Sequence, residues 1–341
     1  MKIIHAFYYI NTYICSIGVK NISFYFYNMK TSVIELYEDE AKKVKNLGYF
    51  INASPSSDAD LFCKQSKLLS QLLPERLRIA LLHFAQYGSE TGFLLIKNIN
   101  LTEPMPQSPP NNSYKIGEKT LLAKIQSILI HVFSEMIAYE AEGDGSLFQD
   151  IVPNKEMAKD QTSLGSTTEL EIHTEQAFSN LRPDILSLAC IRGDENAFTY
   201  ILPIQSIIDN VSDDEFEMLR KPYWKTGVDL SFKLNGHEFI NGDVRGPLPI
   251  INGLRSDPTL LFDQDLMVGL TDESNEMIRK IVDIYYKHRH GHNLKPGEIM
   301  FIDNRRAVHG RSPFYPKFDG NDRFLIRCFS NTVAKHLDAG H

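Results

Sequence analysis

The strongest restriction on the fold comes from three residues that belong together chemically but lie far apart in the chain. His173 and Glu175 are separated by one residue, whereas His309 comes much later. If residues 166–178 form a strand, His173 and Glu175 point to the same face, because side chains alternate along a strand. A fold that joins all three in one metal site must bring the segment of His309 back beside this strand.

The residue types of this group indicate a particular kind of metal site. Two imidazoles and one carboxylate on one side of a metal form the facial triad of non-haem Fe(II) oxygenases, which leaves the other positions open. Those positions take O₂ and a chelating co-substrate. An H-x-E pattern also arises by chance, so an ordinary strand with a polar face is the alternative for this pair alone.

A second strand, predicted over residues 323–329, carries two arginines. Its residues are mainly apolar, aromatic or β-branched, and it follows a turn containing Gly, Asn and Asp. Alternation places Arg323 and Arg327 on the same face. Because an unpaired buried charge is costly and the arginine fork suits carboxylates, we expect one carboxylate from a co-substrate and one from an amino-acid substrate. A solvated strand face with surface ion pairs is the alternative.

These residues together resemble a known enzyme family. His173-x-Glu175, His309 and Arg323, which follows the second histidine by fourteen residues, are arranged as in the clavaminate synthase-like group of Fe(II)/2-oxoglutarate-dependent dioxygenases. Within that group the chain is most similar to the free amino-acid hydroxylases. The resemblance covers roughly residues 35–334.

Two further segments carry the same resemblance. Residues 142–153 resemble the family's stretch before the first metal ligand, and residues 189–199 resemble its segment after the ligand pair. The family resemblance implies that His173, Glu175 and His309 hold Fe(II). It also implies that Arg323 and Thr199 bind the co-substrate 2-oxoglutarate, and that O₂ is consumed.

The resemblance also implies contacts to a free L-amino acid. Arg327 would meet the substrate carboxylate, Glu142 would meet the ammonium group, and Ser163 matches a polar backbone-contact position. Asp263 and Asp265 match the family's acidic lid region. A buried carboxylate there would favour a cationic side chain, because a substrate that leaves the charge unpaired is rejected. A solvated acidic loop is the alternative for these two residues.

The expected reaction is hydroxylation of L-lysine at C4, with C3 as the next choice, giving hydroxylysine, succinate and CO₂. This choice of substrate follows the overall resemblance. Hydroxylation of L-arginine or L-asparagine at C3 is the alternative activity. A jelly-roll protein that holds a metal without turnover, and a hydrolase that uses His173 and Glu175, are alternatives from other classes; the hydrolase lacks a G-x-S-x-G or H-E-x-x-H motif.

Composition excludes several other classes. A net charge of −7 argues against a nucleic-acid-binding surface, and no uninterrupted apolar run is long enough to predict a membrane span. The four cysteines show no paired spacing, which fits a reducing cytoplasm better than a disulfide framework or a zinc site. We therefore expect a cytoplasmic enzyme, and the sequence predicts no oligomeric state.

The order of elements predicts an α+β fold. Residues 33–47 and 120–138 are periodic in the manner of helices, whereas residues 142–330 contain mainly short strands and turns. Helices followed by strands indicate a β-barrel-like core with helices beside it. The family resemblance implies a double-stranded β-helix, or jelly roll, flanked by helices.

The predicted domain organisation is simple. Residues 29–341 are expected to form one dioxygenase domain, with a lid insertion around residues 204–270. Residues 1–28 are apolar and aromatic but interrupted by polar residues, and ordinary globular character begins at Met29. We interpret 1–28 as an upstream extension of the domain; a strand or helix that docks on the domain is the alternative.

Overall fold

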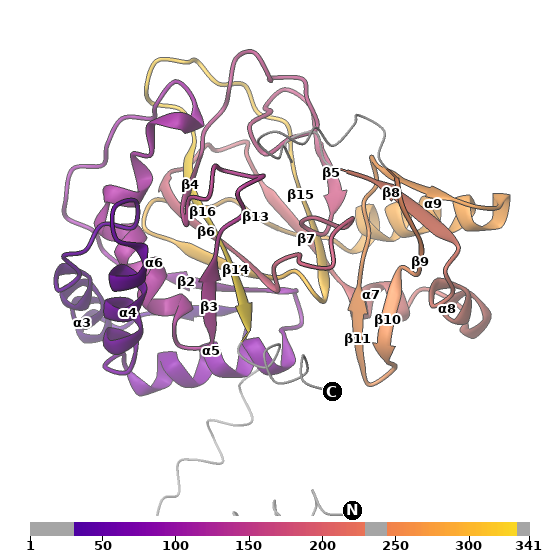
Figure 1. Ribbon diagram of the computed structural model, residues 1–341, viewed down its shortest axis with the longest axis horizontal. Helices are drawn as coiled ribbons and strands as arrows, with labels where there is room; N and C mark the ends of the chain where they lie inside the picture. The colour runs from indigo at the N-terminus through magenta and orange to yellow at the C-terminus, as the bar shows by residue number, and fades with distance from the viewer. Residues whose placement is uncertain (1–30, 229–243, 333–341) are drawn as a thin grey trace, which may run out of the picture. The chain divides into compact units, whose positions relative to one another are not determined.

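The computed structural model describes residues 31–228 and 244–332, and its centre is a pair of β-sheets (Figure 1). In spatial order, the larger sheet contains β1 (Val33–Glu35), β2 (Phe93–Lys97), β14 (Ile299–Asp303), β6 (Ile185–Arg192), β16 (Phe324–Thr332) and β3 (Ser134–Ile137), with β4 (Gln149–Ile151) also pairing with β16. The smaller sheet contains β13 (His290–His292), β7 (Thr199–Pro203), β15 (Ala307–Arg311) and β5 (Leu170–His173).

Side-chain alternation explains how the two sheets pack. Phe93 and Leu95 of β2 share a buried cluster with Ile201 of β7 and Ala307 of β15, so the inner faces of the two sheets meet there. Each apolar side chain buried in this way contributes about 1.5–3 kcal/mol. The inner face of the smaller sheet also carries the polar residues of the candidate site.

Helices cover the outer face of the larger sheet, where alternate residues such as Leu94 and Ile96 point (Figure 1). These helices are α3 (Glu38–Tyr49), α4 (Ala59–Ser70), α5 (Glu75–Tyr87) and α6 (Leu121–Ile130), and two short 3₁₀ turns, η1 (Asn112–Tyr114) and η2 (Gly117–Lys119), precede α6. Asp58 and Thr120 cap α4 and α6 by accepting a backbone N–H with their side chains. These caps explain where the two helices begin.

Two predicted helices are shorter than their sequence periodicity indicated. The helix expected over 33–47 begins only at Glu38, because Val33–Glu35 pairs with β2 as a parallel strand. The helix expected over 120–138 ends at Ile130, because Ser134–Ile137 pairs with β16. In both cases pairing at the edge of the sheet overrides a local helical pattern.

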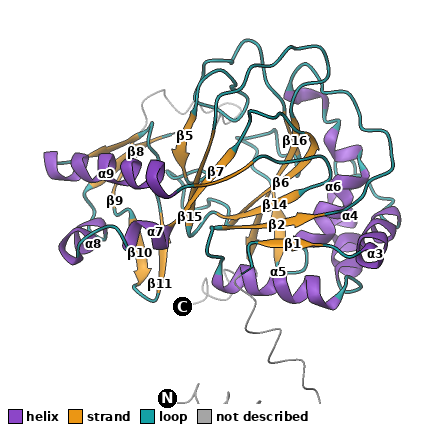
Figure 2. Ribbon diagram, turned by 180° about the vertical axis from the view of Figure 1, so that it is seen from behind, coloured by secondary structure: helices purple, strands orange, loops and turns teal. Residues whose placement is uncertain are grey.

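Residues 204–228 and 244–270 build a separate layer against the outer face of the smaller sheet. Figure 2 shows this layer beside β5, β7 and β15. It contains α7 (Ile204–Ile208), α8 (Asp213–Leu219), a three-stranded sheet in the order β12 (Met267–Gly269), β8 (Trp224–Gly227), β9 (Val244–Leu248), and a hairpin of β10 (Ile251–Leu254) and β11 (Asp257–Leu260). Together with α9 (Asp272–His288), these elements bury Trp224 and pack on Leu202 and Val308.

The architecture confirms the predicted fold class. Two facing sheets of mostly antiparallel strands, flanked by helices, form the double-stranded β-helix expected for an α+β jelly roll. Within the described ranges, no helix is sufficiently long and apolar to cross a membrane. The predicted extension at 1–28 lies outside the described residues.

Candidate active site

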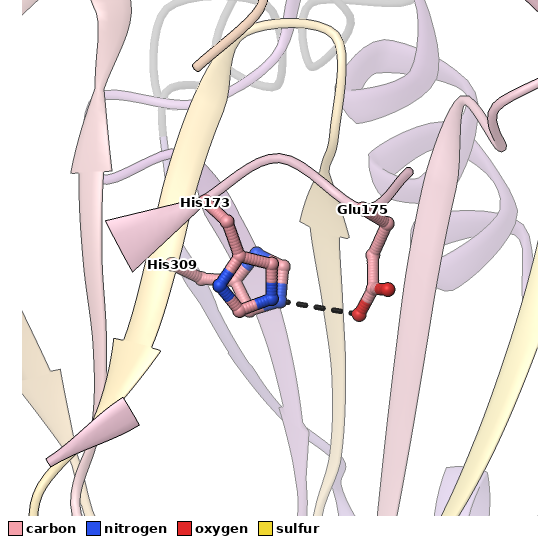
Figure 3. A group of neighbouring side chains, drawn as sticks. All are labelled: His173, Glu175 and His309. Carbon is pink, nitrogen blue, oxygen red and sulfur yellow. Dashed lines mark ion pairs between the residues drawn. The ribbon is translucent and has the colours of Figure 1, made fainter. Parts of the chain in front are cut away.

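The smaller sheet brings the three predicted metal ligands together. β15 runs antiparallel to β5 and pairs His309 with His173, so their rings lie 4.5 Å apart between centroids. The Nε2 atom of His309 lies 3.3 Å from the Oε1 atom of Glu175 (Figure 3). One ligand atom from each of the three residues lies within 4.8 Å of the others, which is a spacing that one metal ion can bridge.

The position of Glu175 differs from the predicted one. The strand expected over 166–178 is only Leu170–His173, so Glu175 lies in the segment that follows it. Its backbone N–H donates to the Oδ1 atom of Asn304 at 2.7 Å, and the next residue, Gln176, has a positive φ of 53°. A side-chain contact and a turn therefore orient Glu175, and strand alternation does not.

The electrostatics of the three residues suit a cation. The Nδ1 atom of His173 lies 2.8 Å from the carbonyl oxygen of Glu171; a proton on Nδ1 donates there and leaves Nε2 free. Burial and the nearby His173 lower the pKa of His309, which favours the neutral imidazole. Burial alone would raise the pKa of Glu175, but Arg327 and the two histidines lower it to about 2.

One cavity beside this group is lined by basic residues, and we call it the arginine cavity. It is bordered by Thr199 of β7, Arg311 of β15 and Arg323, which immediately precedes β16. Arg323 is 6% exposed, and no carboxylate in residues 31–228 or 244–332 forms an ion pair with it. Burial lowers the pKa of Arg323 to about 10. The Oγ1 atom of Thr199 is buried without a hydrogen-bond partner.

The second arginine of this cavity has a different role. The Arg311 guanidinium donates to the carbonyl oxygens of Gly165, Thr168 and Ser312 at 2.5, 3.0 and 3.1 Å. It therefore fastens the loop before β5 to β15. Arg323 is the arginine that a bound carboxylate would neutralise, because a buried cation without a counter-ion is unstable.

Arg327 also borders the arginine cavity, but it is already surrounded by acceptors. It donates to Glu142 and to Gln149, and its Nη1 atom lies 3.6 Å from the Oε1 atom of Glu175. Glu142 also accepts a hydrogen bond of 2.9 Å from Gln176. The structure thus brings two predicted substrate-binding residues, Arg327 and Glu142, into direct contact beside a metal ligand.

A second cavity is rich in acidic residues, and we call it the acidic cavity. Glu142, Glu171, Asp263 and Asp265 border it together with His173, Glu175, Ser163 and Arg327. Asp263 pairs through its backbone with His173, which places the end of the 204–270 insertion against β5. Burial and the nearby Asp265 raise the pKa of Glu171. The concentration of carboxylates favours a cationic occupant.

Comparison with known proteins identifies the family. Residues 89–329 match the family described as taurine catabolism dioxygenase TauD, TfdA family. An L-lysine 3-hydroxylase of Catenulispora acidiphila is 44% identical over 299 residues, covering 88% of this chain and 84% of the relative. An L-asparagine oxygenase of Streptomyces coelicolor is 31% identical, covering 75% and 76%. The chain belongs to the TauD/TfdA dioxygenase family.

Within this family the chain is a clavaminate synthase-like Fe(II)/2-oxoglutarate-dependent dioxygenase and an enzyme of the amino-acid hydroxylase group. The solved structure of asparagine oxygenase with Fe(II), 2S,3S-3-hydroxyasparagine and succinate superposes with a TM-score of 0.83 at 27% identity, covering 91% of this chain and 96% of that one. The His-Glu-His group, Arg323, which has no carboxylate partner among the described residues, and the hydroxyl of Thr199, which has no hydrogen-bond partner, fit this class of cofactor and co-substrate. The non-catalytic alternative is therefore not supported.

Four further residues lie at the site of this dioxygenase that the sequence patterns did not single out. Arg311 follows His309 by two positions on the same strand, so alternation could have placed it beside the metal ligand. Glu171 similarly precedes His173 by two positions. Gln149 meets Arg327 only through the pairing of β4 with β16, and Asn304 reaches Glu175 from the turn between β14 and β15. No local pattern marks these last two contacts.

Proposed function

We propose that this dioxygenase hydroxylates free L-lysine at C3. One oxygen atom of O₂ enters lysine as the new hydroxyl group. The other oxidises 2-oxoglutarate, which leaves as succinate and CO₂. The observation that carries the choice of substrate is the acidic cavity, which places several carboxylates beside the candidate metal ligands.

We assign the metal and co-substrate roles from the two buried, unsatisfied groups and the donor set. His173, Glu175 and His309 would hold Fe(II), which with 2-oxoglutarate and O₂ supplies the oxidising power of the reaction. Arg323 would bind the remote carboxylate of 2-oxoglutarate, assisted by the hydroxyl of Thr199. The guanidinium of Arg323 and the hydroxyl of Thr199 are both buried and border the same cavity, and neither has a carboxylate partner among the described residues. A carboxylate bound between them would accept hydrogen bonds from both.

We assign the substrate roles from the second cavity. Arg327 would receive the substrate carboxylate, and Glu142, which already contacts Arg327, would receive the ammonium group. Ser163 borders both cavities and would donate or accept a hydrogen bond near the substrate backbone. Asp263 and Asp265 would bind the side-chain ammonium of lysine, which offers three donors to carboxylate oxygens.

The negative charge of the acidic cavity favours some of the possible substrates over others. Lysine and arginine both bring a positive side chain that suits a cavity rich in carboxylates, whereas asparagine brings a neutral one. The relative at 44% identity is named as an L-lysine 3-hydroxylase, which favours lysine over arginine. It also favours C3 over the C4 position that the overall sequence resemblance had placed first. Arginine hydroxylated at C3 remains the second candidate.

We further propose that the described parts of the insertion, residues 204–228 and 244–270, act as the lid of the acidic cavity. The end of this insertion supplies Asp263 and Asp265, and the amide nitrogen of Gln264 donates to the carbonyl oxygen of Ile172 at 2.9 Å. A lid that carries the acids would complete the site and exclude water when the substrate enters.

The test is direct turnover with single substrates. Metal-free protein is reconstituted anaerobically with Fe(II) and 2-oxoglutarate, and each of the twenty amino acids is supplied separately before oxygen is admitted. Succinate and any product that has gained one oxygen are measured by mass spectrometry, and NMR of the product locates the hydroxyl group. The matched negative control is the His173→Ala variant.

The expected result is one product, from lysine, hydroxylated at C3. Product from arginine alone would keep the reaction and reject the lysine assignment. A hydroxyl group at C4 of lysine would keep the substrate and reject the position. No amino-acid-dependent succinate from the wild type would contradict the assignment of a free amino acid as substrate.

A further inference from the structure

The metal-ligand group contains one residue that the sheet does not position. His173 and His309 sit on paired strands, and their backbones are held by the ladder between β5 and β15. Glu175 lies beyond the end of β5, where no ladder continues. Its backbone N–H and C=O are nevertheless buried, so both need partners from elsewhere in the protein.

The side chain of Asn304 supplies both partners. Its Oδ1 atom accepts the N–H of Glu175 at 2.7 Å, and its Nδ2 atom donates to the carbonyl oxygen of Glu175 at 3.2 Å. The same Nδ2 atom donates to the carbonyl oxygen of Pro183 at 2.8 Å. One amide side chain therefore replaces the missing neighbouring strand and reaches both polar groups of a single residue.

Asn304 is itself held rigidly. It is 0% exposed, and its backbone N–H donates to the carbonyl oxygen of Asp184 at 3.0 Å. The adjacent Asp303 carboxylate binds the guanidinium groups of Arg305 and Arg306, which stiffens the turn between β14 and β15. A rotation of the Asn304 amide would break three hydrogen bonds inside the protein, and each buried group left without a partner costs about 1–3 kcal/mol.

We propose that Asn304 is a positioning residue that sets where the Glu175 carboxylate lies relative to His173 and His309. The inference rests on the metal site assigned above. Asn304 lies in the turn that joins β14 to β15, and His309 lies on β15, so this one stretch of chain delivers one ligand and holds the backbone of another. The carboxylate can then approach the cation without support from a regular strand.

The alternative is that Asn304 only stabilises a turn, and a matched variant separates the two roles. The Oδ1 atom of Asn331 accepts the N–H of Asp184 at 3.1 Å, so Asn331 anchors the far end of the segment that Asn304 holds. Within the described part of the chain, no hydrogen bond joins Asn331 to Glu175. Asn331→Ala thus removes an amide anchor from the same region and leaves the ligand's own backbone contacts intact.

The experiment measures metal binding in the full-length protein, independently of turnover. Co(II), a spectroscopic substitute for Fe(II), is titrated into metal-free wild type, Asn304→Ala and Asn331→Ala, and its visible absorption reports affinity and ligand geometry. We expect Asn304→Ala to weaken Co(II) binding about 10–100-fold, the usual effect of removing a residue that orients a ligand, and to change the spectrum. Asn331→Ala should lower the melting temperature but keep the wild-type affinity and spectrum.

A wild-type affinity and spectrum in Asn304→Ala would overturn the proposal and leave Asn304 as a structural residue. If Asn304→Ala does not fold, Asn304→Asp is the second variant, because it keeps the acceptor for Glu175 but loses both N–H donations; it must show the same two changes. His173→Ala checks the metal site separately. If the wild type binds no Co(II), the metal site and this inference both fail, whereas binding by wild type and Asn304 variants alike rejects only the role of Asn304.

Discussion

The two cavities that meet at the metal ligands are opposite in charge and in construction. The arginine cavity is built on β7, β15 and the start of β16, which belong to the two central sheets. The acidic cavity takes Asp263 and Asp265 from the end of the 204–270 insertion. In the arginine cavity a buried cation has no carboxylate partner among the described residues, whereas several carboxylates crowd the acidic cavity.

This difference matches the chemistry assigned to each side. The co-substrate is constant for the reaction, so a rigid part of the core with one unpaired arginine can bind it. The amino-acid substrate differs from one hydroxylase to another. Its side chain would be recognised by Asp263 and Asp265, which lie outside the two central sheets. Specificity can then change through the insertion without disturbing the sheets that hold the metal.

The largest effect is expected from removing a metal ligand, because His173 and Glu175 border both cavities. Replacement of His173 or Glu175 by alanine leaves two ligands, and we expect it to abolish both succinate formation and amino-acid hydroxylation. His288→Ala is the matched control, because His288 is an exposed histidine in the last turn of α9. Substantial 2-oxoglutarate-dependent product from either ligand variant would show that the metal is held elsewhere.

The next effect should be confined to the arginine cavity. Arg323→Ala removes the positive charge that would pair with 2-oxoglutarate, and truncating one partner of a buried charge pair costs about 2–5 kcal/mol. The KM for 2-oxoglutarate should therefore rise by roughly 30-fold or more. The KM for lysine should change far less. Steady-state kinetics with each substrate varied in turn measures both.

Arg279→Ala is the control for Arg323→Ala, because Arg279 is an exposed arginine on α9 that pairs only with a nearby glutamate. A larger effect of Arg327→Ala than of Arg323→Ala on the 2-oxoglutarate KM would exchange the roles of the two arginines. In that case the comparison between the two cavities would have to be reversed.

Residues on predicted strands could be placed from the sequence, and some of them border the arginine cavity. Alternation placed Arg323 and Arg327 on one face, and both border this cavity in the structure. The family resemblance added Thr199, which lies at the start of β7 beside His309. The order of helices and strands predicted the α+β class, and the family resemblance implied the jelly roll.

Residues held by long-range contacts could not be predicted in this way. Glu175 was expected on a strand, but the strand ends at His173, and the backbone N–H of Glu175 donates to the side chain of Asn304 instead. The Arg327–Gln149 contact depends on the register between β4 and β16, which no local pattern encodes. The resemblance named Asp263 and Asp265, but only the packing of the insertion on β5 shows that they share a cavity with Glu171.

The acidic cavity is tested by removing one charge without removing the side chain. Asp263→Asn keeps the acceptor that the backbone N–H of Leu266 uses at 2.8 Å, so the local turn should persist. A hydrogen bond to a charged group contributes about 1.5–3 kcal/mol, so the KM for lysine should rise by roughly tenfold or more. The KM for 2-oxoglutarate should stay near the wild-type value.

Asp257→Asn is the matched control, since Asp257 lies in the same insertion but pairs with Arg306 outside the acidic cavity. An unchanged KM for lysine in Asp263→Asn would show that Asp263 belongs to a solvated acidic loop. The cationic selectivity would then have to come from Asp265 or Glu171.

The smallest expected effect has opposite signs for the free protein and for its complex. Thr199→Val preserves the shape of the side chain and removes a buried hydroxyl that has no partner in the protein. Because an unsatisfied buried group costs about 1–3 kcal/mol, the melting temperature of the free protein should rise. The same variant loses one hydrogen bond to 2-oxoglutarate, worth about 0.5–1.5 kcal/mol, so the KM should increase roughly two- to tenfold.

Thr226→Val gives the contrast that makes this prediction specific. Thr226 is also fully buried, but its hydroxyl donates to the carbonyl oxygen of Gly227 at 3.3 Å, so its loss should lower the melting temperature and leave the 2-oxoglutarate KM unchanged. Differential scanning calorimetry and steady-state kinetics measure the two quantities. A lower melting temperature in Thr199→Val with an unchanged KM would mean that Thr199 serves the fold, and the arginine cavity would then bind its carboxylate through Arg323 alone.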